Sequence, residues 1–137
     1  VDGSGAHASQ RLRVTLGNGR VGKLENVATK RAIDSALIDP ARSVQVGIRT
    51  VNHDTLGVNI IDAREVHETG PQAVAAKIKS ILGGNKTYLT FDIDALDPAF
   101  APGAGTPVWG GLASWQVAAM LRDLAGINLV GGDVVEA

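Results

Sequence analysis

Residues 87–107 read TYLTFDIDALDPAFAPGAGTP, an apolar run that ends in carboxylates and continues into a segment rich in proline and glycine. The apolar run predicts a β-strand, and the prolines between residues 98 and 107 disfavour a regular helix or strand beyond it. Carboxylates at the end of a strand lie at the edge of the sheet where open α/β folds bind ligands. The stretch therefore predicts a strand followed by a fixed loop that forms the wall of a ligand site.

The sequence around this stretch alternates between strand and helix patterns. Strands are predicted at residues 44–48, 57–63, 88–93 and 128–134, and helices at residues 30–39, 72–82 and 115–124. Strands that alternate with helices imply right-handed crossovers and a mainly parallel sheet covered by helices. We therefore expect an α/β domain of three layers, with the sheet between two layers of helices.

Residues 1–29 differ from the rest of the chain because they are rich in glycine and basic residues and show little apolar periodicity. Within them RLRVTL, at residues 11–16, fits a short strand. A poorly ordered arm fits the same segment equally well, and both interpretations stay open on the sequence alone. We divide the chain into an atypical N-terminal segment, residues 1–29, and an α/β domain, residues 30–137.

The overall composition limits the classes of partner. A chain of 137 residues is long enough for one domain with a core, and its net charge of −1 gives no reason to expect a nucleic acid or a membrane surface as partner. No apolar run approaches the roughly 18 residues that cross a bilayer. Cysteine is absent, so a bound metal would be held by oxygen or imidazole. We expect a soluble cytoplasmic protein.

Asp92 and Asp94 follow the apolar run at positions i and i+2. In an extended strand both side chains leave the same face. Two carboxylates at such a short distance repel each other unless a cation lies between them. Hard oxygen ligands suit Mg²⁺ or Mn²⁺. The alternative is that both residues only cap loops and helix N-termini. The Asp-x-Asp pattern alone leaves both interpretations open.

Three longer segments help to decide between a metal site and a capping role for these carboxylates. Residues 90–112, TFDIDALDPAFAPGAGTPVWGGL, closely resemble a signature of the ureohydrolase family, which includes arginase, agmatinase, guanidinobutyrase and formimidoylglutamase. Residues 128–137, NLVGGDVVEA, resemble a later segment of that family, and residues 36–50, ALIDPARSVQVGIRT, are similar to its agmatinase subgroup. The resemblance covers residues 30–137. It implies an arginase-like α/β fold that is incomplete at both ends.

The resemblance also implies a chemistry. In this family two manganese ions about 3–4 Å apart share a hydroxide that attacks the guanidinium carbon of the substrate. Carried over by position, Asp92 and Asp94 are catalytic metal ligands, Glu136 forms a salt bridge with the guanidinium, and Thr106 lines the site. The implied reaction is hydrolysis of a guanidino C–N bond, agmatine to putrescine and urea, in a homo-oligomer. We expect the carboxylates of Asp92, Asp94 and Glu136 to converge, with Glu136 within about 15 Å of Asp92.

Other parts of the family pattern are missing. The remaining ligands of the family come from a Gly-Gly-Asp-His stretch and an Asp-x-His-x-Asp strand end, and neither is present. Asp2 and His7 are five residues apart, which does not place both side chains on one edge of a strand, so His7 is interpreted as a tail residue. His53 and His67 match no ligand motif and are expected in surface connections. Ala104 replaces the first threonine of the usual Pro-Gly-Thr-Gly-Thr-Pro.

Three functions therefore compete. The first is the C-terminal part of an agmatinase-like enzyme, from which we expect no urea release without the missing segments. The second is a non-catalytic remnant that keeps half of a metal site and acts as an assembly module. The third, a nucleotide-binding α/β domain, is weakened because LGNGRVG, at residues 16–22, lacks the G-x-G-x-x-G spacing. Metal stoichiometry separates the first two, and nucleotide binding would support the third.

Overall fold

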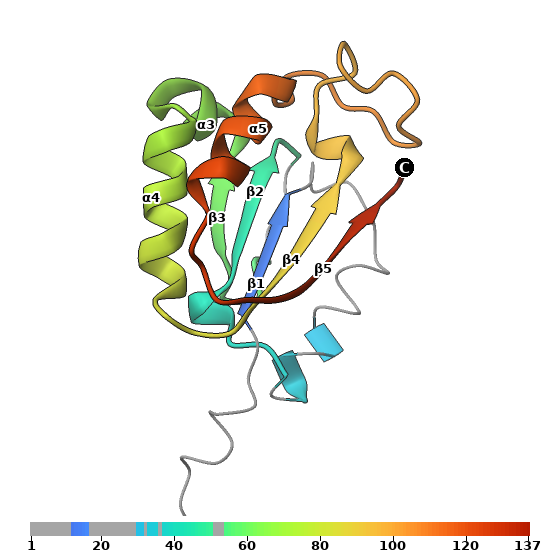
Figure 1. Cartoon of the computed structure of the whole chain (residues 1–137). Coiled ribbons are helices and arrows are strands. Elements are labelled where there is room, and N and C mark those ends of the chain that lie inside the picture. Colours follow the sequence, from blue (N-terminus) through green and yellow to red (C-terminus); the bar gives the residue numbers. More distant parts are fainter. Residues whose placement is uncertain (1–11, 17–29, 32, 36, 51–53) are drawn as a thin grey trace, which may run out of the picture.

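The computed structural model describes residues 12–16, 30–31, 33–35, 37–50 and 54–137, and one parallel sheet forms its centre (Figure 1). The strands are β1 Leu12–Leu16, β2 Val44–Ile48, β3 Asn59–Asp62, β4 Thr87–Asp92 and β5 Leu129–Val135. The helices are α3 Ala63–Thr69, α4 Pro71–Leu82 and α5 Ser114–Asp123, with the single-turn 3-10 helices η1 Pro40–Arg42 and η2 Ile93–Ala95. The predicted parallel α/β fold is confirmed.

The strands lie in the order β3-β2-β1-β4-β5, and all neighbouring strands are parallel. From β1 the chain builds the sheet outward through β2 to β3. It then returns to the other side of β1 and continues through β4 to β5. The strand order therefore reverses between β1 and β4. In open α/β sheets a ligand site forms at the carboxyl ends of the strands where the order reverses.

Strand β1 lies in the interior of the sheet and pairs with both β2 and β4. The strand interpretation of residues 11–16 is therefore confirmed for Leu12–Leu16. Backbone hydrogen bonds join β1 to both of these neighbours. The other residues of the N-terminal segment, and the poorly ordered arm expected there, lie outside the described residues.

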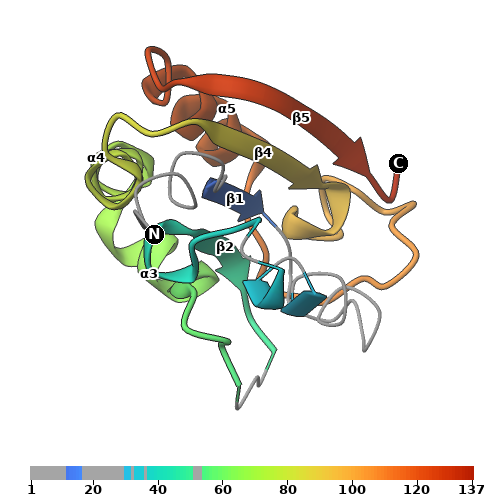
Figure 2. The ribbon, with the colours of Figure 1, turned by 90° about the horizontal axis from the view of Figure 1, so that it is seen from below.

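Helices α3, α4 and α5 lie on one face of the sheet (Figure 2). The core forms between this face and the helices, and its largest fully buried side chains are Val44, Val46, Ile61, Val66, Val74, Ile78, Leu82, Leu112 and Met120. Within the described ranges, the opposite face is not covered by any helix of the length of α3 or longer. The second helical layer that we expected is therefore not found among the described residues. None of the described helices is long and apolar enough to cross a membrane.

Helix α4 agrees with its sequence prediction. It begins at Pro71, whose fixed φ suits the first turn, and it buries Val74 and Ile78 against the core. It ends at Gly83, where the backbone has a φ of +59° and the N–H donates to the carbonyl of Lys79. Glycine adopts this left-handed conformation without steric cost, so the Gly-Gly pair at residues 83–84 ends the helix as the pattern predicts.

Strand β3 is shorter than predicted because a helix begins inside the predicted strand. Residues 57–63 were expected as a strand, but the strand ends at Asp62 and α3 follows at once. The side chain of Asp62 accepts a hydrogen bond from the backbone N–H of Glu65 at 2.7 Å, which caps the helix N-terminus. The Asp-x-x-Glu spacing is a start signal for a helix that the strand prediction overlooked.

Two other helices also differ from expectation. The helix predicted at residues 30–39 is shorter: of its described residues, 30, 31, 33 and 34 are helical, and η1 begins at Pro40. Helix α5 begins at Ser114, one residue before its predicted start, and its cap position falls on Ala113. The N–H of Ala113 donates to the side-chain oxygen of Gln116 at 2.9 Å and thereby anchors this end of the helix.

Candidate active site

Asp92 is the last residue of β4 and lies beside the point where the order of the strands reverses (Figure 1). Its neighbour Phe91 pairs with Leu16 of β1, and Asp92 itself pairs with Val135 of β5. The residue is only 1% exposed. A carboxylate buried to this degree needs hydrogen-bond or ionic partners. The strand therefore places Asp92 at the sheet edge where the sequence predicted a site.

Asp94 belongs to η2 and not to the strand. The expectation that Asp92 and Asp94 share one face of an extended strand is therefore wrong, because β4 ends at Asp92 and the chain turns. The turn brings the pair together differently: Oδ1 of Asp92 accepts a hydrogen bond from the backbone N–H of Asp94 at 3.0 Å. Asp94 is also 1% exposed. Asp92 thus caps η2, as the structural alternative proposed, while both carboxyl groups remain at the edge of the sheet.

Thr106, near the other end of the loop, contacts the side chain of Asp94. Its hydroxyl donates to Oδ2 of Asp94 at 3.1 Å. The contact joins residues that are 12 positions apart in sequence. A hydrogen bond to a carboxylate is stronger than one between neutral groups. The loop between them therefore folds back over the end of β4 and fixes one oxygen of the Asp94 carboxylate.

Glu136 follows β5 directly and comes close to the same loop. Its backbone has a φ of +59°, which is uncommon for a residue other than glycine. A methyl group at Gly105 would lie 3.9 Å from Oε2 of Glu136, so the carboxylate lies beside the residue that precedes Thr106. Asp92 pairs with Val135, and neighbouring strands are about 4.8 Å apart, which keeps Glu136 well within the 15 Å limit set above.

Asp97 ties the two ends of the loop together through backbone amides. One of its oxygens accepts from Ala99 at 3.0 Å, and the other accepts from Gly110 and Gly111 at 2.9 and 3.0 Å. The N–H of Ala99 lowers the pKa of this carboxyl most, and Gly111, Gly110 and Arg49 lower it further, against the opposing effect of burial. Asp97 therefore supports the loop.

Arg49 is a residue of this region that the sequence analysis missed. It follows β2 and is partly buried, and its guanidinium donates to backbone carbonyls on both ends of the loop. Burial lowers its pKa, and the charges of Asp94 and Asp97 oppose that shift. The sequence did contain a signal for Arg49, namely a cationic residue directly after a buried parallel strand. That position lies at the carboxyl edge of the sheet, where ligand sites form.

The histidines do not contribute to this site within the described residues. His67 is an exposed residue of α3 and not of a connection as expected. Its Nδ1 accepts from the side-chain amide of Gln116 at 3.2 Å, which leaves Nε2 to donate to the carbonyl of Gly110 at 3.3 Å. His7 and His53 lie outside the described residues. Asp133 of β5 accepts a hydrogen bond from the hydroxyl of Tyr88 at 3.0 Å.

The described residues do not fit a complete two-ion manganese centre. Among them, no group of three or more His, Cys, Asp or Glu side chains is arranged to hold a metal ion. Oδ1 of Asp92 and Oδ2 of Asp94 accept hydrogen bonds from donors of the protein. Beyond β1, the strand beside β4, the sequence continues as GNG, which contains no carboxylate or imidazole. Asp92 and Asp94 therefore form at most a part of such a centre.

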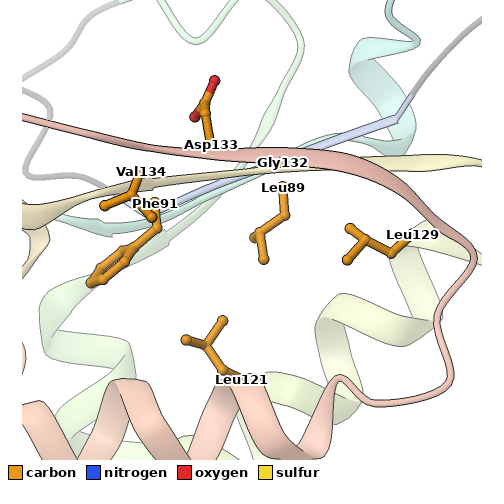
Figure 3. A pocket seen from close by; sticks show the side chains of 7 residues that line it. All are labelled: Leu89, Phe91, Leu121, Leu129, Gly132, Asp133 and Val134. Atoms are coloured by element: carbon orange, nitrogen blue, oxygen red, sulfur yellow. The ribbon is translucent and has the colours of Figure 1, made fainter.

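A cavity of about 380 Å³ lies beside β4 and β5, away from the carboxylates of the candidate site. Leu89, Phe91 and Leu129 project into it towards Leu121 of α5, whereas the side chain of Asp133 points to the opposite face of the sheet (Figure 3). Apart from Asp133, whose side chain points away, its lining consists of apolar residues and a glycine. We therefore do not assign it to the candidate site.

Comparisons with known proteins agree with this geometry. The model of the arginase family matches residues 7–137. Agmatinase of Chromobacterium violaceum is 52% identical over 106 residues, which are 77% of this chain and 33% of that protein. Agmatinase of Proteus mirabilis is 51% identical over 105 residues, 77% of this chain and 34% of that protein. The chain therefore spans about a third of the length of these curated relatives.

Solved structures show the same relationship. A hypothetical agmatinase from Burkholderia thailandensis has a TM-score of 0.86 and 48% identity, over 95% of this chain and 44% of that chain. The proclavaminate amidino hydrolase of Streptomyces clavuligerus has a TM-score of 0.80 and 35% identity, over 93% of this chain and 46% of that chain. The strand order, the loop after β4 and these matches together show that the chain belongs to the arginase family.

Proposed function

We propose that this chain carries one part of an agmatinase-type active site and serves the hydrolysis of a guanidino C–N bond, agmatine to putrescine and urea. The observation that carries the proposal is the closed loop after β4, which places Thr106 on the carboxylate of Asp94 and Gly105 beside that of Glu136. Three residues that match the family pattern thus lie at one edge of the sheet. The agmatinases named above share about half of their residues with this chain over the aligned region.

The roles of the individual residues follow from their chemistry. A guanidinium is a planar cation that a carboxylate binds well, and Glu136 is exposed beside the loop where such a substrate can reach it. Thr106 holds the carboxylate of Asp94 in place. Manganese would supply activated water when bound, but Asp92 and Asp94 need further ligands to hold it. We therefore propose that a complete site requires segments with the Gly-Gly-Asp-His and Asp-x-His-x-Asp motifs.

The test compares the chain as given with the same chain preceded by an upstream segment that carries both motifs. With saturating Mn²⁺ and agmatine, we expect no urea above a metal-only blank from the first protein and clear release from the second. Asp94→Asn in the longer protein should abolish the release. Urea release by the chain as given, lost on Asp94→Asn, would show that residues outside the described ranges complete the site. No release by the longer protein would contradict the proposed function.

A further inference from the structure

The guanidinium of Arg49 bridges elements that are distant in the sequence. Arg49 follows β2, and its contacts lie on the loop after β4, so the side chain passes the carboxyl end of β1, the strand between them. On one side it donates to carbonyl oxygens of η2 and its end: Asp94 at 2.8 Å, Ala95 at 3.2 Å and Leu96 at 3.3 Å. On the other side Nε and Nη2 donate to the carbonyl of Val108 at 2.9 and 2.8 Å.

These contacts suit a guanidinium in particular. Its five N–H donors lie in one rigid plane and can serve several carbonyls at once. The last carbonyls of a short helix have no partner within the helix and carry partial negative charge. A further bond, from Nη1 to the carbonyl of Gly47 at 3.1 Å, fixes the guanidinium to the end of its own strand. The cation therefore adds donors to the carbonyls at the end of η2 and at Val108, of which that of Ala95 also accepts from the N–H of Leu112 at 3.0 Å.

We propose that Arg49 is a positioning residue that closes the loop of residues 94–111 and thereby holds Thr106 against Asp94. Arg49 binds carbonyls at both ends of this loop, and Asp97 binds amides at both ends. These two side chains add to the backbone bonds that join Leu112 to Ala95 and Asp97 at the base of the loop. Thr106 lies between the tied points, and its hydroxyl reaches Oδ2 of Asp94. Arg49 donates to the backbone carbonyl of Asp94 and not to its side chain. Its effect on the contact between Thr106 and the Asp94 carboxylate is therefore indirect, through the position of the loop. That this contact belongs to an active site rests on the proposed function, whereas the closure of the loop does not.

The proposal predicts that charge alone cannot replace the guanidinium. A lysine ammonium is a single compact group at the end of a flexible stem, so it cannot bind the carbonyls near residue 95 and that of Val108 in the same fixed geometry. Arg49→Lys should therefore open the loop nearly as much as Arg49→Met. Arg64 offers a matched control: it is 83% exposed, and its pairing is with Glu68 on the surface of α3.

The experiment uses hydrogen exchange and methyl NMR on the chain as given, on Arg49→Lys and Arg49→Met, and on Arg64→Lys and Arg64→Met. In both Arg49 variants, we expect the protection of the amides of Gly110 and Gly111 to fall by about tenfold or more, and that of the α4 core amides by less than about threefold, because a loop can open without global unfolding. The Thr106 methyl resonance should shift, while that of Thr90 on β4 stays in place. The Arg64 variants should resemble the unchanged chain.

Two results would overturn the proposal. Equal loss of protection in the loop and in α4 would mean that Arg49 only contributes to overall stability. Full protection of the loop in Arg49→Lys would mean that a positive charge suffices and that the guanidinium geometry is not required. Neither measurement uses agmatine or a metal, so a failure of the proposed function in the urea assay leaves this test unaffected.

Discussion

Gly111 permits the close packing at the end of the loop. A methyl group at this position would lie 2.6 Å from the backbone nitrogen of Asp97 and 2.7 Å from Nη2 of Arg49. Both distances are below any real contact of a Cβ atom, and one of the neighbours is backbone. The absence of a side chain therefore lets Asp97 and Arg49 approach the loop from two directions. A single residue thus decides whether the loop can close.

Gly111→Ala should destabilise the chain by about 1–3 kcal/mol in the free energy of unfolding, the usual cost of forcing extra volume into a packed site. Chemical denaturation of the variant and the unchanged chain measures this difference. Gly103→Ala is the matched control, because Gly103 lies in the same loop and has no atom within 4 Å of an added methyl group. The control should leave stability unchanged or raise it slightly. Equal effects of the two substitutions would contradict the packing explanation.

At the scale of the element, the loop after β4 depends on an ionised carboxylate. The amide of Ala99 is the main cause that lowers the pKa of Asp97 below its ordinary value of 3.8. When the pKa of a carboxyl group is lower in the folded than in the unfolded chain, the group stabilises the fold at every pH above its pKa in the unfolded chain. That contribution disappears as the pH falls through the folded pKa. The loop should therefore lose its anchor in acid, below pH 3.8.

Asp97→Asn tests this dependence. The variant should be less stable than the unchanged chain at neutral pH. The difference should shrink as the pH falls below 3.8, because the unfolded chain then takes up a proton at Asp97 while the folded chain still holds this carboxyl ionised. It should be lost once the pH has also fallen through the lower pKa of the folded chain. Urea denaturation across this range measures both free energies of unfolding. Asp123→Asn, at the end of α5, is an exposed control that should show no such trend. A difference that stays constant with pH would mean that charge on Asp97 does not hold the loop.

At the scale of the whole molecule, the competing functions differ in how many ions the chain binds. Asp92 and Asp94 are two carboxylates without a third acidic or histidine ligand among the described residues. A hard cation held by one or two carboxylates keeps most of its water and binds weakly.

Equilibrium dialysis against Mn²⁺ should therefore show fewer than two ions per chain for residues 1–137 alone, and two for the protein with an added upstream segment that carries both motifs. Asp94→Asn should weaken binding in both. Two tightly bound ions in the chain as given would favour the enzyme over the non-catalytic remnant. Saturable binding of ATP in place of Mn²⁺ would instead support the nucleotide-binding alternative.

The sequence by itself determined the parallel α/β fold, helix α4 and the strand and loop around Asp92. These features follow from patterns within a few residues, namely apolar periodicity, proline positions and the Gly-Gly pair after α4. The family motif at residues 90–112 is likewise local. The same local reasoning missed α3, because its start signal lies within an apolar run that also suits a strand.

Only the tertiary structure decided how the candidate site is assembled. It placed β1 between β2 and β4, turned Asp94 out of the strand and brought Thr106 onto its carboxylate. It also joined Arg49 to Val108, which is 59 residues further along the chain. Periodicity and spacing describe neighbours within one element and cannot specify contacts between distant elements. Those contacts arise because folding buries backbone carbonyls and amides that then need partners, and Arg49 and Asp97 are the side chains that reach them.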